Sequence, residues 1–207
     1  VFLTLILLLV VVLLGSLLTY NKLVSSGYFL RRTVSAQTEN YEADNAVASY
    51  FFNSYYQQFM SQYSYMASYF GLNTSKSLKA QSCSMLESGG TWFDYFMNTT
   101  KSTLTRTLVF CEEAKARGLA LDDADYQMID DAIASLKNAA KSAGVSKSYY
   151  ILAMYGAGVS EKDIRRALEL SALSSKCYNE IVSAYSYTTD DYNAYKDIDK
   201  RFTQRGG

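Results

Sequence analysis

The residues of this chain that could do chemistry are acidic pairs and cysteines, because the sequence contains no histidine. Without imidazole there is no Ser-His-Asp or Cys-His arrangement, no imidazole-ligated zinc, and no ordinary general base near neutral pH. Each acidic pair falls near a predicted helix start or on a solvated helix face, and none has EF-hand spacing. We therefore interpret the pairs as structural. They are Asp122-Asp123, Asp130-Asp131 and Asp190-Asp191.

The three cysteines, Cys83, Cys111 and Cys177, are widely spaced and form no CxxC or metal-ligand pattern. We expect buried free thiols and no disulfide framework. No glycine-rich phosphate loop follows a strand pattern. The 20 basic residues balance the 20 acidic ones, so nothing indicates a nucleic-acid partner. These observations predict no catalytic residues, no metal site and no cofactor, which favours a protein that is not an enzyme.

The most unusual segment lies between Asp44 and Lys76, where no residue is charged and aromatic rings are dense. Part of it follows helical spacing and is assigned to the core: Ala48, Phe52, Tyr55, Phe59, Tyr63, Met66 and Phe70. The complementary set is predicted to lie on the flanks or the open surface: Tyr50, Phe51, Tyr56, Met60, Tyr65 and Tyr69. Tyrosine and methionine suit adaptable contacts with apolar peptides. The alternative is that other helices, or the polar connector, cover this set.

The elements that would position these side chains are helices, and the fold class expected is all-α. The chain has no proline, so long helices can run without interruption. Four glycines stand where helices would end in a left-handed residue: Gly71, Gly118, Gly144 and Gly156. The aromatic helix is predicted over Tyr41–Phe70, followed by a serine-rich loop over Gly71–Gly90.

Further helices are predicted from their capping residues. Thr91 with Asp94 opens a helix that carries a core stripe of Trp92, Phe96, Leu104, Leu108 and Cys111 and ends at Gly118. The next starts at Asp122 or Asp123, a short one runs from Ser146 to Tyr155, and Ser160 with Asp163 opens a longer one. A last helix is expected from Thr188 or Thr189 to about Phe202.

The beginning of the chain is strongly apolar, with no charge before Lys22. About 20 apolar helical residues can span a bilayer, so we expect a transmembrane signal-anchor over residues 1–20; a cleaved signal is the alternative. A polar connector over 21–40 and a helical domain over 41–207 would follow. Lys22, Arg31 and Arg32 leave the orientation undecided on charge alone.

The order of several segments resembles a known family. The segments YFFNSYYQQFMSQYSYMASYFGLNTSKSL, TWFDYFMNTTKSTL and YGAGVSEKDIRRALE, with Gln81 between the first two, are similar to the N-terminal chaperone region of SurA/PrsA-type foldases. The resemblance covers Tyr41–Lys196. It implies an irregular multi-helix chaperone domain, tethered to the membrane on the extracytoplasmic side, that holds unfolded or newly exported polypeptides. The parvulin domain that accompanies this region in the family is missing here, so isomerase activity is not implied.

The leading functional hypothesis is a membrane-anchored holdase that binds polypeptide clients on the aromatic set Tyr50, Phe51, Tyr56, Met60, Tyr65 and Tyr69. One alternative is an assembly protein of an envelope complex with a single fixed partner. Another is the chaperone half of a longer parvulin-type prolyl isomerase. The oligomeric state is not predicted by any pattern in the sequence.

Overall fold

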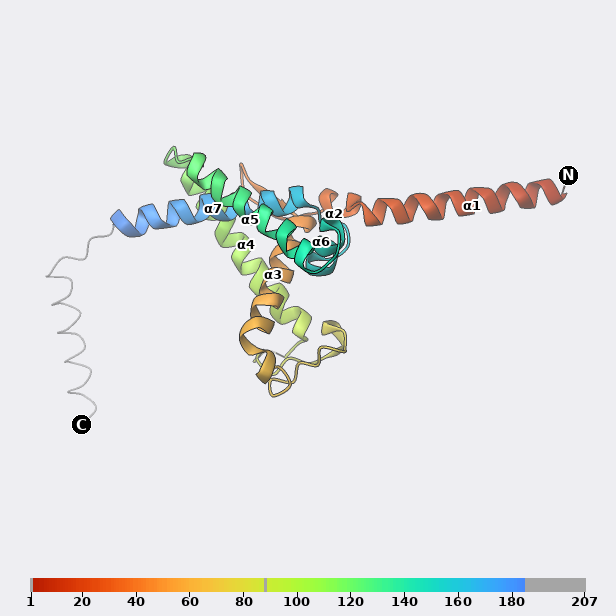
Figure 1. The fold of residues 1–207 in the computed structure, drawn as a ribbon, viewed down its shortest axis with the longest axis horizontal. Coiled ribbons are helices and arrows are strands. Elements are labelled where there is room, and N and C mark those ends of the chain that lie inside the picture. Colours follow the sequence, from red (N-terminus) through yellow and green to blue (C-terminus); the bar gives the residue numbers. More distant parts are fainter. Residues whose placement is uncertain (1, 88, 185–207) are drawn as a thin grey trace.

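A computed structural model describes residues 2–87 and 89–184, with side chains from residue 10 onward. Over these residues the chain is mainly helical, with one two-stranded antiparallel sheet (Figure 1). The elements are α1 (Phe2–Ser25), α2 (Tyr28–Arg32), β1 (Val34–Gln37), β2 (Glu42–Asp44), α3 (Asn45–Tyr63), α4 (Trp92–Ala116), α5 (Asp123–Ser142), α6 (Lys147–Tyr155) and α7 (Glu161–Ala184). The expected all-α character is confirmed over the described residues, and the predicted last helix lies outside them.

Local capping chemistry sets most helix starts where the sequence predicts them. Thr91 and Asp94 form a reciprocal capping box at the start of α4. Asp122 caps α5, and the Ser146 hydroxyl accepts the amide of Tyr149 at the start of α6. The predicted glycine ends are confirmed for Gly118 after α4 and Gly144 after α5, with φ of 72° and 69°, but Gly71 does not end the aromatic helix, because α3 stops at Tyr63. Each cap satisfies a backbone group that a helix end leaves unpaired.

The aromatic helix is shorter than Tyr41–Phe70 at both ends. At its start, Asp44 accepts hydrogen bonds from the amides of Ala46 and Val47, so α3 begins at Asn45. The residues before it form β2, which pairs with β1 through Ala36 opposite Ala43. At its end, α3 gives way after Tyr63 to a 3₁₀ turn over Ser64–Met66, and the chain folds back.

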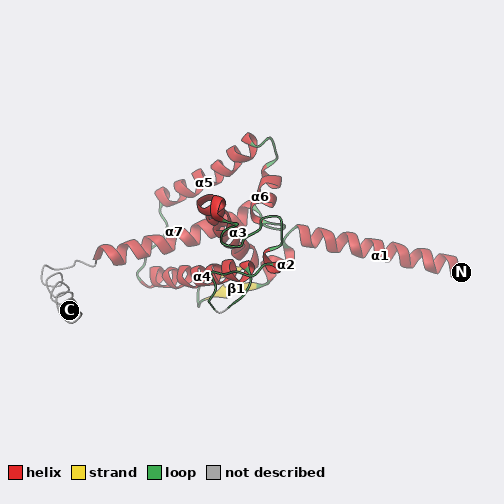
Figure 2. Cartoon of the chain, turned by 90° about the horizontal axis from the view of Figure 1, so that it is seen from below, coloured by secondary structure: helices red, strands yellow, loops and turns green. Residues whose placement is uncertain are grey.

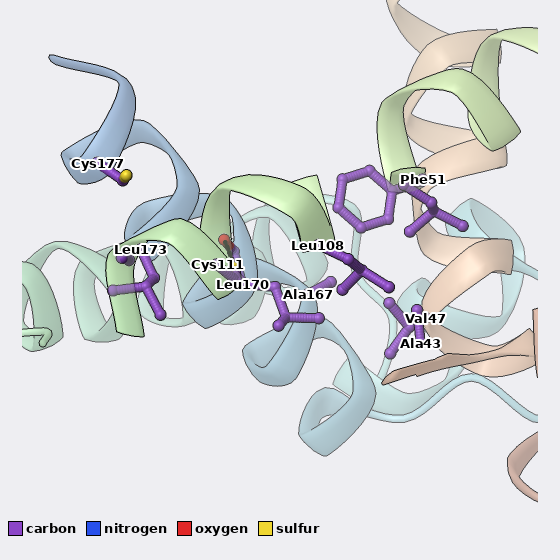
Figure 3. Packing of buried hydrophobic residues seen from close by; sticks show 11 residues of the cluster. Ala43, Val47, Phe51, Leu108, Cys111, Ala167, Leu170, Leu173 and Cys177 are labelled. Atoms are coloured by element: carbon purple, nitrogen blue, oxygen red, sulfur yellow. Dashed lines mark hydrogen bonds between the residues drawn. The ribbon is translucent and has the colours of Figure 1, made fainter. Parts of the chain in front are cut away.

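The core consists of three clusters that meet at α3. The first joins α3, α4 and α7, and Figure 3 shows Val47 and Phe51 of α3 beside Leu108 of α4. The second surrounds Trp92 and Phe59, and the third joins α5, α6 and α7. The Tyr50 ring packs against the first and third clusters, and the Tyr55 ring against the first and second.

Two arginines of distant segments tie the elements around this core. Arg31 of α2 binds Asp163 of α7, and Arg166 of α7 binds Asp44 at the start of α3. Helix α1 extends away from this body in both views (Figures 1 and 2), and β1 lies beside α4 in the second.

The expectation of a transmembrane signal-anchor over residues 1–20 requires correction. Across the described residues, no helix combines the length and the apolar character needed to cross a membrane. A span needs about 20 consecutive apolar residues.

Candidate functional site

A groove of about 670 Å³ lies between α3 and α4 and is bordered by α2 and β1. Its lining comes from α2, β1, α3 and α4 and includes both apolar and polar side chains. The apolar residues are Leu30, Ala36, Ala48, Phe52, Phe93, Met97 and Leu104. The polar residues are Ser35, Asn45, Ser49, Asn53, Thr100, Lys101 and Thr105.

The groove exists because one face of each long helix is turned toward the other. Late in α3, Phe59 packs on Trp92 at the start of α4, whereas Val47, early in α3, shares a cluster with Leu108 further along α4. The two helices are therefore antiparallel. The lining residues of α4 recur at steps of three and four, and those of α3 do the same, which places each set on one helical face.

The apolar end of the groove is formed by Phe52 and Phe93, whose ring centroids are 5.3 Å apart at an interplanar angle of 40°. Met97 lies one helical turn after Phe93. All three side chains are half-buried, so each retains a face that a ligand can cover. Rings and a thioether in a partly enclosed hollow are typical of sites that bind apolar groups.

Some polar side chains of the lining form hydrogen bonds within the protein. Asn53 donates through Nδ2 to the carbonyl oxygens of Ser49 and Tyr155, at 2.9 Å in both cases. The Ser35 hydroxyl donates to the Asn45 side-chain oxygen. These bonds hold the side chains in place, so this part of the groove keeps its shape without a ligand.

Strand β1 contributes two residues to the lining of this region. Ser35 and Ala36 line the groove, and within the described residues β1 pairs with β2 alone. Strand residues with one free side can accept an additional extended chain by backbone hydrogen bonding. The groove therefore combines apolar side chains with residues of a strand that pairs on one side among the described residues.

The six aromatic and methionine residues expected to face clients do not share one surface. Phe51 is only 7% exposed and belongs to the first core cluster, so its expected exposure is wrong. Tyr50 stacks on Tyr155 with centroids 5.0 Å apart, and burial raises its pKa. Tyr56 packs on Phe96 with centroids 5.5 Å apart, at the second cluster.

The remaining three of that set lie toward the end of α3 and beyond it. Met60 is half-buried against the second cluster. Tyr65 and Tyr69 are 80% and 83% exposed, in the turn that follows the helix. Only these two tyrosines of the six stand fully available to solvent among the described side chains. The structure thus divides the set into one core residue, three residues that pack against core clusters, and two exposed tyrosines.

The stripe assigned to the core is confirmed only in part. Phe59 is buried in the second cluster, and Tyr55 packs beside it while its hydroxyl donates to Thr103 Oγ1 at 2.9 Å. Phe52 lines the groove, and Tyr63 is 41% exposed. The stripe loses its register after Tyr63 because the helix ends there.

The amides of the uncharged segment have a structural role that the sequence did not reveal. Asn53 and Gln57 of α3 donate to the carbonyl oxygens of Tyr155 and Met154, at 2.9 Å and 2.6 Å. These carbonyls belong to the last turn of α6, where helical partners are lacking. Neutral amides satisfy them without burying a charge, which explains why polar residues here are uncharged.

The acidic pairs with described side chains are structural, as predicted. Lys176 donates to Asp122 and Asp125 at 2.6 Å and 2.7 Å, and Arg165 donates to Asp130 at 2.5 Å. Asp131 accepts from Gln127. No group of acidic or cysteine residues in the described part could hold a metal ion. Asp190-Asp191 lies outside the described residues.

Cys83, Cys111 and Cys177 are buried and free, which confirms the expectation for the cysteines. Burial raises the pKa of Cys111 to about 12, with further contributions from Cys177 and Glu112. A thiol with so high a pKa carries almost no thiolate near neutral pH, so it is a poor nucleophile.

Phe93, Met97 and β1 are the site residues that the sequence analysis missed. Phe93 and Met97 each follow a residue of the predicted core stripe of α4, Trp92 and Phe96. Their spacing of four was a usable signal for a second apolar face on the same helix.

No match to a family model, a curated protein or a solved structure was found for this chain.

Proposed function

We propose that this chain binds extended apolar segments of other polypeptides in the groove between α3 and α4, as a holdase chaperone does. The observation that carries the proposal is the half-exposed pair of rings, Phe52 and Phe93, beside Met97 in a groove of about 670 Å³. The wall contributed by α3 contains no charged side chain. The resemblance of Tyr41–Lys196 to foldase chaperone regions supports the same proposal.

The size and chemistry of the groove suit a few apolar side chains of an extended chain. Ligand pockets commonly measure about 300–1,000 Å³, and the groove falls within that range. Each apolar side chain that leaves water there contributes about 25 cal/mol per Å² of area buried. Ordering of the client opposes this gain, so individual segments bind weakly and exchange. Weak, sequence-tolerant binding is what a holdase requires.

Tyr65 and Tyr69 form a second candidate contact at the turn after α3. Their rings are 80% and 83% exposed, and they lie beyond the helix end rather than in the groove. Tyrosine supplies a large contact area with few rotatable bonds. We propose that these rings add contacts to longer clients, while the groove supplies the main site.

Suppression of aggregation tests the proposal directly. A chemically unfolded client is diluted into buffer with and without the protein, and light scattering is followed. The groove variant Phe93→Ser with Met97→Ser is compared with Tyr126→Ser plus Met128→Ser. The control residues are 46% and 62% exposed on α5. Circular dichroism establishes that both variants remain folded.

We expect the wild-type protein and the α5 control to suppress scattering, and the groove variant to lose most of that suppression. Equal suppression by the groove variant and the control would refute the groove as the site. Absence of suppression by the folded wild-type protein would refute the holdase function. Tight saturable binding to one partner alone would then favour the fixed-partner alternative.

A further inference from the structure

An apolar patch, called here the α4–α7 patch, is formed by Val109 and Phe110 of α4 and by Tyr178 and Val182 of α7. Val109, Tyr178 and Val182 are 54%, 51% and 49% exposed. The Phe110 ring packs edge to face on the Tyr178 ring, with centroids 5.7 Å apart at an interplanar angle of 86°. None of these four residues lines the groove. The patch is therefore a second apolar surface, which the proposed function does not use.

A hollow of about 320 Å³ adjoins the two rings of the α4–α7 patch. Its lining residues are Arg106, Phe110, Ser174, Ser175 and Tyr178. Ser174, Tyr178 and Val182 recur every four positions, so they form one row along α7. The distance at which two helices pack depends on the side chains in contact. Because serine is small, another helix can approach α7 closely beside the rings.

A positive charge stands at the edge of this hollow. Arg106 is exposed and has no hydrogen bond or ion pair with another described residue. A guanidinium attracts a carboxylate that comes within reach, and opposite charges favour one partner over others. An occupant with apolar side chains and a carboxylate would thus complement both the rings and Arg106.

The part of the chain best placed to cover the patch is the part that continues from α7. Val182 lies in the last turn of α7, which ends at Ala184. The sequence predicts a further helix, about over 188–202, which lies outside the described residues. Residues 185–187 would then connect two antiparallel helices, and αα-hairpins have connections of about two to five residues. A helix over 188–202 is about 22 Å long, more than the roughly 15 Å from Ser174 to Ala184 along α7.

The spacing of side chains in this predicted helix matches the patch. One of its faces carries three rings and one carboxylate, at steps of three and four. These residues are Tyr192, Tyr195, Asp199 and Phe202. In an antiparallel hairpin, residues equally far from the connection lie side by side, which brings Asp199 level with the turn of α7 that contains Ser174. Arg106 lines the same hollow as Ser174, so the carboxylate and the guanidinium can meet.

We propose that residues 188–202 fold back as a helix on the α4–α7 patch, with Asp199 paired to Arg106. The helix and α7 then form a hairpin that buries the half-exposed rings of the patch. Because the segment is tethered at Ala184, its effective concentration at the patch is high, so it outcompetes a second copy of the chain. The patch lies outside the groove, so the proposal does not depend on the proposed function.

Hydrogen exchange of the full chain, followed by mass spectrometry of its peptides, tests this packing. The patch variant is Tyr178→Ser with Val182→Ser. The matched control is Tyr126→Ser with Met128→Ser, whose residues are 46% and 62% exposed on α5. Arg106→Gln removes the proposed ion pair alone. Circular dichroism establishes that each variant is folded, and analytical ultracentrifugation over a range of protein concentrations detects association between copies.

We expect residues 190–202 of the wild-type protein and of the control to exchange about tenfold or more slowly than an unstructured peptide of the same sequence, as for locally ordered structure. This protection should not depend on protein concentration. The patch variant should lose most of it. Arg106→Gln should reduce it by about twofold to fivefold, as the loss of an exposed ion pair gives, and high salt should have a similar effect on the wild-type protein.

Three results would overturn the proposal. The first is the absence of protection over 190–202 in the folded wild-type protein. The second is equal protection in the wild-type protein and the patch variant, which would mean that the segment is ordered elsewhere. The third is protection that appears only together with dimers, which would assign the patch to a second copy. Unchanged protection in Arg106→Gln would reject the pairing with Asp199. If the patch variant fails to fold, Val182→Ser alone replaces it.

Discussion

Arg31 binds both carboxylate oxygens of Asp163, which lies 132 positions later in the chain: Nε donates to Oδ1 at 2.8 Å and Nη2 to Oδ2 at 2.5 Å. Nη2 also donates to the Gly158 carbonyl oxygen and to Ser160 Oγ. A planar guanidinium suits such a forked arrangement. One side chain of α2 therefore fixes the beginning of α7, beside the groove border at Leu30.

Arg31→Ala should destabilise the protein by about 2–3 kcal/mol, because Asp163 would keep its buried position without a cationic partner. The Asp163 side chain is 6% exposed and that of Arg31 is 32% exposed. Urea unfolding followed by circular dichroism measures the change. Arg165→Ala, which removes an exposed pair with Asp130, should cost less than about 1 kcal/mol. Equal costs for the two variants would contradict the expectation.

The stability of the fold should fall in acid partly because of Asp163. Burial by itself would raise the pKa of Asp163, but hydrogen bonds from Arg31 and Ser160 outweigh it and hold the pKa below its ordinary value. The unfolded chain then takes up this proton more readily. The stabilisation is therefore full above the ordinary carboxyl pKa of about 3.9 and is lost as pH falls through the folded-state value.

Unfolding free energies measured by urea titration from pH 7 to acid pH check this. The decline below about pH 5 should be shallower in Asp163→Asn, which has no carboxyl to protonate. Asp130→Asn is the matched control, since its carboxylate is 55% exposed. A decline in Asp163→Asn as steep as in the wild-type protein would show that this carboxyl is not responsible.

Gly27→Ala should be far more harmful than Gly118→Ala, although both glycines have left-handed φ, 74° and 72°. A Cβ on Gly27 would lie 2.1 Å from the Gly158 carbonyl oxygen, whereas one on Gly118 would meet nothing within 4 Å. We expect Gly118→Ala to cost about 1 kcal/mol through strain, and Gly27→Ala at least about 2 kcal/mol more through the clash. Thermal unfolding compares them, and similar losses would mean that the close approach is easily relieved.

Asn53→Ala should loosen the end of α6, because the Tyr155 carbonyl oxygen loses its donor from α3. A net cost of about 1 kcal/mol is expected, and it should be concentrated in α6. Amide hydrogen exchange measured by NMR would locate faster exchange there. Asn98→Ala, at an exposed position of α4, serves as the control. Uniform acceleration over all helices would instead indicate global destabilisation.

Cys111 should resist alkylation in the folded protein. Burial raises its pKa to about 12, and the thiolate is the reactive form. Iodoacetamide at pH 8 should modify it only as fast as the protein unfolds, and mass spectrometry after brief exposure should find it unmodified. Denatured protein should react at all three cysteines. Rapid modification of folded protein at Cys111 would contradict the burial.

The elements that could be predicted are those governed by local interactions. Thr91, Asp122 and Ser146 begin helices through bonds to amides within a few residues, so their sequence context is sufficient. The start of the aromatic helix was misplaced because β1 pairs with β2 there. That pairing depends on contacts across a turn, and the strands are very short: β1 alternates apolar and polar residues over only four positions, and β2 has three.

The candidate site could be predicted only in outline. The aromatic, uncharged character of α3 indicated a contact surface. Which rings are exposed depends on how α3 packs against α4, α6 and α7, and helical spacing does not contain that information. Phe51, expected on the surface, faces Leu108 in the core, while Phe52, expected in the core, lines the groove. Phe51 and Phe52 are adjacent in the sequence, so their side chains leave the helix in different directions, one toward the core and the other toward the groove.

The rings of Tyr50 and Tyr55 couple the three core clusters to one another. Both rings belong to α3, while α4 also contributes to the first and second clusters and α7 to the first and third. Detachment of α5 and α6 breaks the link through Tyr50 but leaves Tyr55 and the wall opposite α4 in place. We therefore expect that local unfolding of α5 and α6 would leave the contacts between α3 and α4 at the groove in place.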